Sequence, residues 1–122
     1  MFFPISGWFA AFVLTLVIEL PITAWFLRRV EPDLSRRVVL IAFANLATHL
    51  AVWYVFSQLF VIRTIEYVLA AEGWAIGAEA VFFFVAFRGL AARRAIAIAL
   101  VANGLSFAIG RIVGGIWPDL FR

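Results

Sequence analysis

Cysteine and lysine are both missing from the sequence, and each absence excludes a class of chemistry. Without cysteine, the chain forms no disulfide, no thiolate metal site and no iron–sulfur cluster. Without lysine, it forms no Schiff base with retinal or pyridoxal phosphate (PLP). Its single histidine, His49, excludes a haem held by two histidines of one protomer. We therefore expect no haem, iron–sulfur, retinal or PLP cofactor.

Charged residues are also scarce, at 14% of the 122 residues, whereas soluble domains average about 25%. Apolar residues make up 66% of the chain, against roughly 45–50% in soluble domains. A soluble fold of this size could not cover so much apolar surface. The apolar residues amount to about four stretches of 20, each long enough to cross a hydrocarbon core of roughly 30 Å. We therefore predict an integral membrane protein whose main partner is the lipid bilayer.

Four apolar stretches are separated by short charged connections. Their near-continuous apolar character lacks the alternation of a membrane β-barrel, so each is predicted to be a helix. Short connections make consecutive helices antiparallel, which predicts an all-α, up-and-down bundle of four transmembrane helices in one domain, 1–122. The segment 61–71, which contains Arg63 and Glu66, is either an interfacial loop or an early start of the third helix. The predicted spans are about 7–27, 38–60, 66–87 and 95–116.

The distribution of arginine predicts the orientation in the membrane, because Arg and Lys are retained on the cytoplasmic side. Seven of the ten arginines fall in the first and third connections, whereas Arg63, Arg111 and Arg122 fall toward the other side. Both termini are therefore expected outside. We interpret the formal charge of +3 as this topology signal, and we expect no nucleic-acid partner. Three tryptophans then lie at the outer interface, where indole rings prefer to sit: Trp8, Trp74 and Trp117.

Small residues in the outer half indicate where helices touch. Gly73 and Gly77 in the third span, and Gly110 and Gly114 in the fourth, follow the i, i+4 spacing that lets helix backbones approach closely. This pattern predicts a tight contact between the third and fourth spans. The alternative is a dimer in which the fourth span faces a second copy of the chain.

Two charged residues lie at matching depth in the same outer half. Glu72 and Arg111 are each about 7–9 Å from the midpoint of their span, at a rise of 1.5 Å per residue. An unpaired charge at that depth is costly, so we predict that the two residues form a structural ion pair.

Each span also carries a polar residue near its own centre. We predict that Glu19, His49 and Glu79 converge on one site near the bilayer midplane. Ionisable groups inside a bilayer are functional candidates by default. Two carboxylates and an imidazole can bind a divalent metal ion, the one cofactor we consider, or relay protons. The residues expected to support this site, from their similar depth, are Asn45, Asn103 and Ser106.

Several functions remain open at this point. Cation binding or transport is the leading hypothesis. A metal-dependent intramembrane enzyme, in which Glu19 or Glu79 activates a metal-bound water, is a second. A non-catalytic subunit or scaffold of a larger membrane complex is a third. The structural alternative is a protonated carboxyl network around a neutral His49 that only fixes helix register. Because so small a bundle encloses little volume, transport favours a homo-oligomer or a membrane-protein partner.

Four short patterns, one in each span, resemble a group of small, uncharacterised four-span bacterial membrane proteins. The patterns are E-L-P, N-L-A-T-H, E-G-W-A-I-G-A-E and N-G-L-S-F-A-I-G. The resemblance covers most of the chain, implies a multi-pass protein of the bacterial inner (plasma) membrane, and brings no activity with it. Leu50 departs from the pattern, because many of those sequences have proline after the histidine. The matching positions are Glu19, Asn45, His49, Glu72, Glu79, Asn103 and Ser106.

Overall fold

The structure of the protein is a computed structural model, which describes residues 5–121. The sequence predicts that both termini, and Arg122 with them, lie on the outer side of the membrane. The terminal residues that this prediction concerns are not among those that the structure describes. Every regular element within residues 5–121 is a helix, and no strand occurs there. The predicted all-α class is therefore confirmed, and four long apolar helices identify an integral membrane protein.

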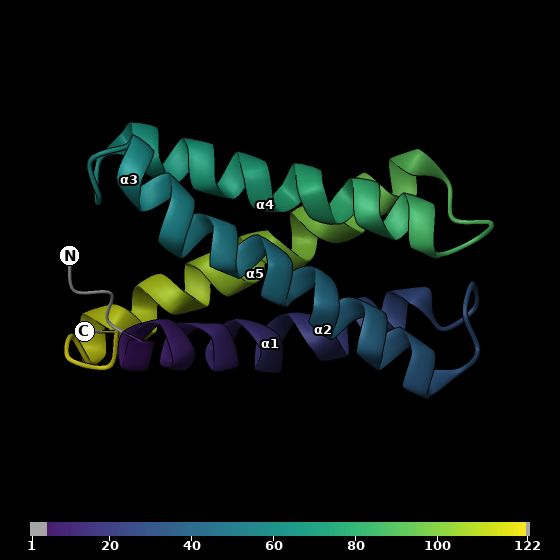
Figure 1. Ribbon diagram of the computed structural model, residues 1–122. Coiled ribbons are helices and arrows are strands. Elements are labelled where there is room, and N and C mark those ends of the chain that lie inside the picture. Colours follow the sequence, from purple (N-terminus) through teal and green to yellow (C-terminus); the bar gives the residue numbers. More distant parts are fainter. Residues whose placement is uncertain (1–4, 122) are drawn as a thin grey trace.

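Four helical spans are long and apolar enough to cross a membrane (Figure 1). The first span is α1, Ile5–Leu27. The second runs without interruption through α2, Leu34–Ala51, the π-helical turn η1, Val52–Phe56, and α3, Ser57–Leu59. The third is α4, Ile65–Ala86, and the fourth is α5, Ala92–Ile116.

Polar caps determine where the second and third spans begin. The side chain of Asp33 accepts hydrogen bonds from the backbone N–H groups of Ser35, at 3.0 Å, and Arg36, at 3.4 Å. Thr64 caps α4 in the same way, by accepting from the N–H of Tyr67 at 3.3 Å. These caps satisfy N–H groups that have no partner inside the helix. Helices α2 and α4 therefore begin directly after a capping residue, before the apolar run that marked their predicted start.

The ambiguous segment 61–71 contains both a turn and the start of a helix. Residues 60–64 form the turn between α3 and α4, and helix α4 begins at Ile65. Arg63 has a φ of 72°, a left-handed conformation that is uncommon outside glycine and helps the chain reverse direction.

The four spans pack in a closed ring, in which α1 contacts α2, α2 contacts α4, α4 contacts α5 and α5 contacts α1. We call the end that carries the connections 28–33 and 87–91 the loop end, and the end that carries the turn 60–64 the turn end. The start of α1 and the last residues of α5 also lie at the turn end (Figure 1). Figure 1 further shows that α4 and α5 are close at the loop end and diverge toward the turn end.

The buried apolar residues gather in the half of the bundle near the loop end. They come from the end of α1, the first half of α2, the second half of α4 and the start of α5. The largest of these buried residues are Phe83 and Phe87, and both are fully buried. The other members of this apolar core are Leu27, Ile41, Ala44, Ala80, Leu90, Ala95, Ile98 and Ala99.

Arginine side chains close the loop end. The last carbonyl groups of a helix have no intrahelical partner, and three of those in α1 accept from arginines instead. Arg28 donates to the carbonyl of Trp25 at 2.6 Å. Two other helices reach the same helix end: Arg37 of α2 donates to Ala24, at 2.5 Å, and Arg94 of α5 donates to Phe26, at 3.1 Å.

The predicted glycine contact between the third and fourth spans is wrong. A Cβ atom added at Gly73, Gly77 or Gly110 would meet nothing within 4 Å, and one at Gly114 would meet only the ring of Phe121, at 3.4 Å. There are two physical reasons. Gly73 and Gly77 are exposed on a face of α4 that does not line the cavity between the spans, and α4 and α5 diverge toward the turn end. The other predicted use of the glycines, contact with a second copy, stays a prediction.

Candidate functional site

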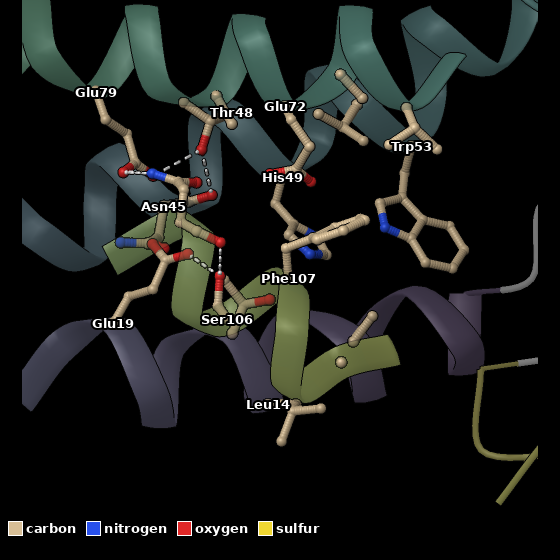
Figure 2. Close-up of a pocket in the computed structure, with 18 of the residues that line it drawn as sticks. Leu14, Glu19, Asn45, Thr48, His49, Trp53, Glu72, Glu79, Ser106 and Phe107 are labelled. Atoms are coloured by element: carbon tan, nitrogen blue, oxygen red, sulfur yellow. Dashed lines mark hydrogen bonds between the residues drawn. The ribbon is translucent and has the colours of Figure 1, made fainter. Parts of the chain in front are cut away.

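A cavity of about 290 Å³ occupies the turn-end half of the bundle, between the four spans. Its inner end lies near mid-depth, where the apolar core begins, and is lined by Glu19, Asn45, Glu79 and Asn103. Its outer end is lined by Trp53, Tyr67, Arg111 and Phe121. Figure 2 shows the side chains of Glu19, Asn45 and Glu79 at one end of the cavity, and those of His49 and Trp53 toward the other.

The carboxyl group of Glu79 lies between two neighbouring helices and is bound by both. Thr48 of α2 lies 3.2 Å from Oε1 through its Oγ1 atom, and the amide nitrogen of Asn103, on α5, donates to Oε2 at 2.7 Å. Glu79 is only 1% exposed. Both carboxyl oxygens therefore have a partner in a region from which bulk water is excluded.

The carboxyl group of Glu19 is buried to the same extent and has only one partner. The hydroxyl of Ser106, on α5, makes a short hydrogen bond to Oε1. The other oxygen, Oε2, is buried without a hydrogen-bond partner. A buried acceptor left unpaired is unfavourable, and Oε2 is the unsatisfied oxygen of this carboxyl group.

Ser106 and Asn103 join the two carboxyl groups into one hydrogen-bonded chain. They are three residues apart on α5, and Ser106 Oγ lies 3.1 Å from the carbonyl oxygen of Asn103. The chain runs from Glu19 through Ser106 and Asn103 to Glu79, and ends at Thr48. This hydrogen-bonded chain therefore includes at least one residue from each of the helices α1, α2, α4 and α5.

The hydroxyl groups in this chain have fewer protons than acceptors. Ser106 has one proton and two acceptors, Glu19 Oε1 and the carbonyl of Asn103. Thr48 has one proton and three acceptors, Glu79 Oε1 and the carbonyls of Ala44, at 3.0 Å, and Asn45, at 3.1 Å. A hydroxyl can donate to an ionised carboxylate, or donate to a carbonyl and accept from a protonated carboxyl. Both protonation states of each carboxyl are thus accommodated by rotating a hydroxyl.

The predicted supporting residues line the same cavity as these two carboxyl groups. Asn45 donates through its amide nitrogen to the carbonyl of Ile41 at 3.0 Å, which turns its Oδ1 atom away from that bond. Oδ1 is buried without a partner, although Asn45 is only 1% exposed. Asn103 and Ser106 are members of the hydrogen-bonded chain itself.

His49 lines the same cavity but lies apart from the hydrogen-bonded chain. Its ring centroid is 5.7 Å from that of Phe12, 6.2 Å from that of Trp53 and 6.4 Å from that of Trp8. Its Nδ1 atom is buried without a hydrogen-bond partner. Over the part of the chain that the structure describes, no three His, Asp or Glu side chains lie close enough together to hold one metal ion. The structure therefore brings Glu19 and Glu79 into one network and leaves His49 among aromatic rings.

The predicted ion pair between Glu72 and Arg111 does not form. Both residues line the outer part of the cavity, Glu72 on α4 and Arg111 on the neighbouring helix α5. Within residues 5–121, however, the observed ion pair is a different one, between Arg36 and Glu31 at 2.9 Å. Helices α4 and α5 diverge toward the turn end (Figure 1), and Arg111 is exposed. Matched depth is therefore insufficient to bring these two side chains together.

Several residues that matter here were not among the predicted site residues. Thr48 is the partner of Glu79, and its position three residues after Asn45 was a signal for it. Trp53 and Phe107 line the cavity, but nothing distinguishes them in a sequence with 17% aromatic residues. Val52 and Trp53 belong to the π-helical turn η1, whose extra residue per turn changes the face that the following residues present.

Carboxyl groups outnumber cationic groups in the lining of the cavity. Three carboxyl groups and one guanidinium line it, and the unpaired polar atoms at its inner end are the acceptors Glu19 Oε2 and Asn45 Oδ1. Apolar side chains form most of the remaining wall.

No protein-family model matches the chain, and comparisons with curated proteins and with solved structures find no match.

Proposed function

We propose that this integral membrane protein binds a cation at the Glu19–Glu79 carboxyl pair, and that protons compete with the cation for the same carboxyls. The observation that supports this function is the hydrogen-bonded chain between the two carboxyls, with a rotatable hydroxyl beside each one. A network that served only to fix helix register would need no group able to serve both protonation states. Exchange of a proton for a cation at the carboxyls does need such a group.

Access to the carboxyl pair is from the turn end only. The cavity reaches Glu19 and Glu79 from that side, whereas the apolar core lies directly beyond them toward the loop end. Because Glu19 and Glu79 are each only 1% exposed, side chains must move before a cation from the turn end reaches the carboxyl oxygens. Transport to the other side would require the apolar core to open, or a partner chain to supply a path.

Infrared spectroscopy tests this function through the carbonyl band of protonated carboxyl groups. In the purified protein, raising the pH should remove this band, and adding Na⁺, Mg²⁺ or butylammonium at constant pH should remove it with release of protons. The Glu19→Gln and Glu79→Gln variants should each lose part of the band. Glu66→Gln is the control, because Glu66 is exposed in the first turn of α4. A band that responds to none of these cations would rule the proposal out, whether or not it responds to pH.

A divalent metal ion remains one candidate for the cation. Carboxylate and amide oxygens are suitable ligands for hard divalent ions, and Glu19, Glu79 and Asn45 offer both kinds. In that case, protonation of the carboxyls should weaken metal binding as the pH falls. Elemental analysis of the purified protein tests this version: a stoichiometric divalent metal supports it, and a metal-free protein that still exchanges protons with other cations excludes it.

A second candidate function, that of a subunit or scaffold in a larger membrane complex, is favoured by a separate feature. An apolar groove of about 690 Å³ runs along the outward face of α4, away from the cavity. Its two glycines lower the helix surface and allow another helix to approach closely. A Gly77→Leu variant should then lose a co-purifying membrane partner and keep the carboxyl band. The groove is lined by Gly73, Trp74, Gly77, Ala78, Val81, Phe82 and Val85.

A further inference from the structure

Building on the proposed function, we infer that the cation is a small primary ammonium compound, whose ammonium group binds Glu19 and Asn45 and whose short alkyl part lies against the apolar wall of the cavity. The inference names the chemical class of the ligand, which the proposed function leaves open.

The unpaired acceptors at the inner end of the cavity identify the head of the ligand. Glu19 Oε2 and Asn45 Oδ1 are both buried without a partner, on residues that are each 1% exposed. Both residues line the inner end, where Figure 2 shows them together with Glu79. A primary ammonium group carries three N–H donors, a positive charge and no acceptor, so it can satisfy both oxygens and balance one carboxylate.

The remaining wall of the cavity indicates an organic ligand. Apolar side chains line it between the carboxyl pair and the outer end, and they include Leu14, Val52, Ala75 and Phe107. A hydrated inorganic ion gains nothing from such a wall, whereas an alkyl group gains from leaving water. The volume of about 290 Å³ lies just below the usual range for ligand pockets, roughly 300–1,000 Å³. A short alkyl chain therefore fits better than a large amphiphile.

The N–H donors distinguish a primary from a quaternary ammonium ligand. A quaternary ion carries the same charge and can lie on the aromatic rings of Trp53 and Phe107. It has no N–H group, however, and would leave Glu19 Oε2 and Asn45 Oδ1 unpaired. A site that hydrogen-bonds the N–H groups of its ligand therefore discriminates strongly against an analogue without them.

Protons should compete with the ligand, since the ammonium group requires an ionised carboxylate. Groups from all four spans contribute to this dependence on pH. The titratable and charged residues that face the cavity are Glu19 of α1, His49 of α2, Tyr67, Glu72 and Glu79 of α4, and Arg111 of α5.

Isothermal titration calorimetry of the purified full-length protein tests the inference with two isomers. Butylammonium and tetramethylammonium have the same atoms and charge, and only butylammonium has N–H donors. We expect butylammonium to bind at least about tenfold more tightly, the effect of losing one charge-assisted hydrogen bond. Glu19→Gln should weaken butylammonium binding by about tenfold or more, and Glu66→Gln should leave it unchanged. Equal binding of the isomers, or binding that Glu19→Gln does not affect, overturns the inference.

A cavity-filling variant covers the case in which Glu19→Gln fails to fold. Ala75→Leu reduces the cavity from the α4 wall and leaves both carboxyls in place. It should abolish butylammonium binding and retain the infrared carboxyl band. If wild-type protein exchanges protons with Na⁺ or Mg²⁺ but does not bind butylammonium, the inference fails and the proposed function stands. If the carboxyl band responds to no cation, both fail.

Discussion

The amide of Asn103 donates to Glu79 over 2.7 Å at the level where the apolar core ends and the cavity begins. The second amide proton of Asn103 goes to the carbonyl of Ala99, at 2.9 Å, so both protons are used and the side chain is fixed. Thr48, on the other side of Glu79, has a choice of acceptors. Glu79 therefore has one fixed donor and one neighbour that can either donate or accept.

Replacing the fixed donor should destabilise the protein. Asn103→Leu leaves Glu79 Oε2 buried without its partner, a loss of about 1–3 kcal/mol in the free energy of unfolding. Unfolding in mixed detergent micelles measures it. Ser57→Ala is the matched control, because Ser57 bonds only to the carbonyl of Trp53 in its own helix, at 2.6 Å, and should change stability by less than about 0.5 kcal/mol. Equal effects of the two variants would mean that Glu79 does not depend on Asn103.

Removing the rotatable hydroxyl should affect cation binding more than stability. Thr48→Val keeps the shape of the side chain and removes the group that donates to the ionised form of Glu79. We expect it to weaken cation binding about three- to tenfold, the range for one hydrogen bond. Thr48→Ser should restore binding, because it retains the hydroxyl. Unchanged binding in Thr48→Val would show that the hydroxyl plays no part in charge exchange.

The charges of Glu72 and Arg111 should act independently. Since the two residues form no ion pair, Glu72→Gln and Arg111→Gln should change stability by amounts that add in the double variant, within about 0.5 kcal/mol. Equilibrium unfolding of the four proteins of this cycle measures the coupling. A clearly larger coupling energy would indicate that the side chains meet in the membrane.

His49 should be replaceable by another aromatic residue. Its ring lies among Phe12, Trp8 and Trp53, so His49→Phe keeps an aromatic ring at this position and removes the imidazole nitrogens. Cation binding should stay within about twofold of wild type, because no hydrogen bond to either carboxyl is lost. A loss of binding in His49→Phe, with normal folding, would place the imidazole among the ligands.

Chemical labelling tests the predicted orientation in the membrane. The chain has no cysteine, so single cysteines at Ser35, near the start of α2, and at Leu120, after α5, provide unique labels. Both positions are exposed. An impermeant thiol reagent added to intact cells should label the cysteine at position 120 and not the one at 35, as the arginine distribution requires. The opposite pattern would reverse the orientation, and labelling at both positions would contradict the four-span topology.

The helical spans could be predicted from the sequence because hydropathy and length determine them directly. A stretch of about 20 apolar residues has few alternatives in a membrane. The axial depth of Glu19, Glu79, Asn45 and Asn103 followed from the same arithmetic, since each residue advances a helix by about 1.5 Å. The presence of these four residues at one level of the bundle could therefore be predicted from the sequence.

Depth alone does not determine which side chains touch. Gly73 and Gly77 match the depth of the α5 glycines but lie on an exposed face of α4. Glu72 and Arg111 also have matching depths and form no ion pair, in the part of the bundle where α4 and α5 diverge. That divergence arises from packing of the whole bundle and leaves no local pattern in the sequence. The position of Trp53 in the cavity wall depends on the π-helical turn η1, which the residue types of Val52–Phe56 do not predict.

The closed inner end of the cavity has an electrical consequence in an energised membrane. A cation that moves from the turn end to Glu19 travels past more than half of the length of α1 and crosses none of the remainder. Moving one charge through a full potential of 100 mV involves about 2.3 kcal/mol, so in a uniform field this binding step alone involves more than about 1 kcal/mol. The membrane voltage should therefore change the affinity of the ionised carboxylate for the cation several-fold, whereas exchange of one monovalent cation for one proton moves no net charge. The sign of the change would reveal which side of the membrane the turn end faces.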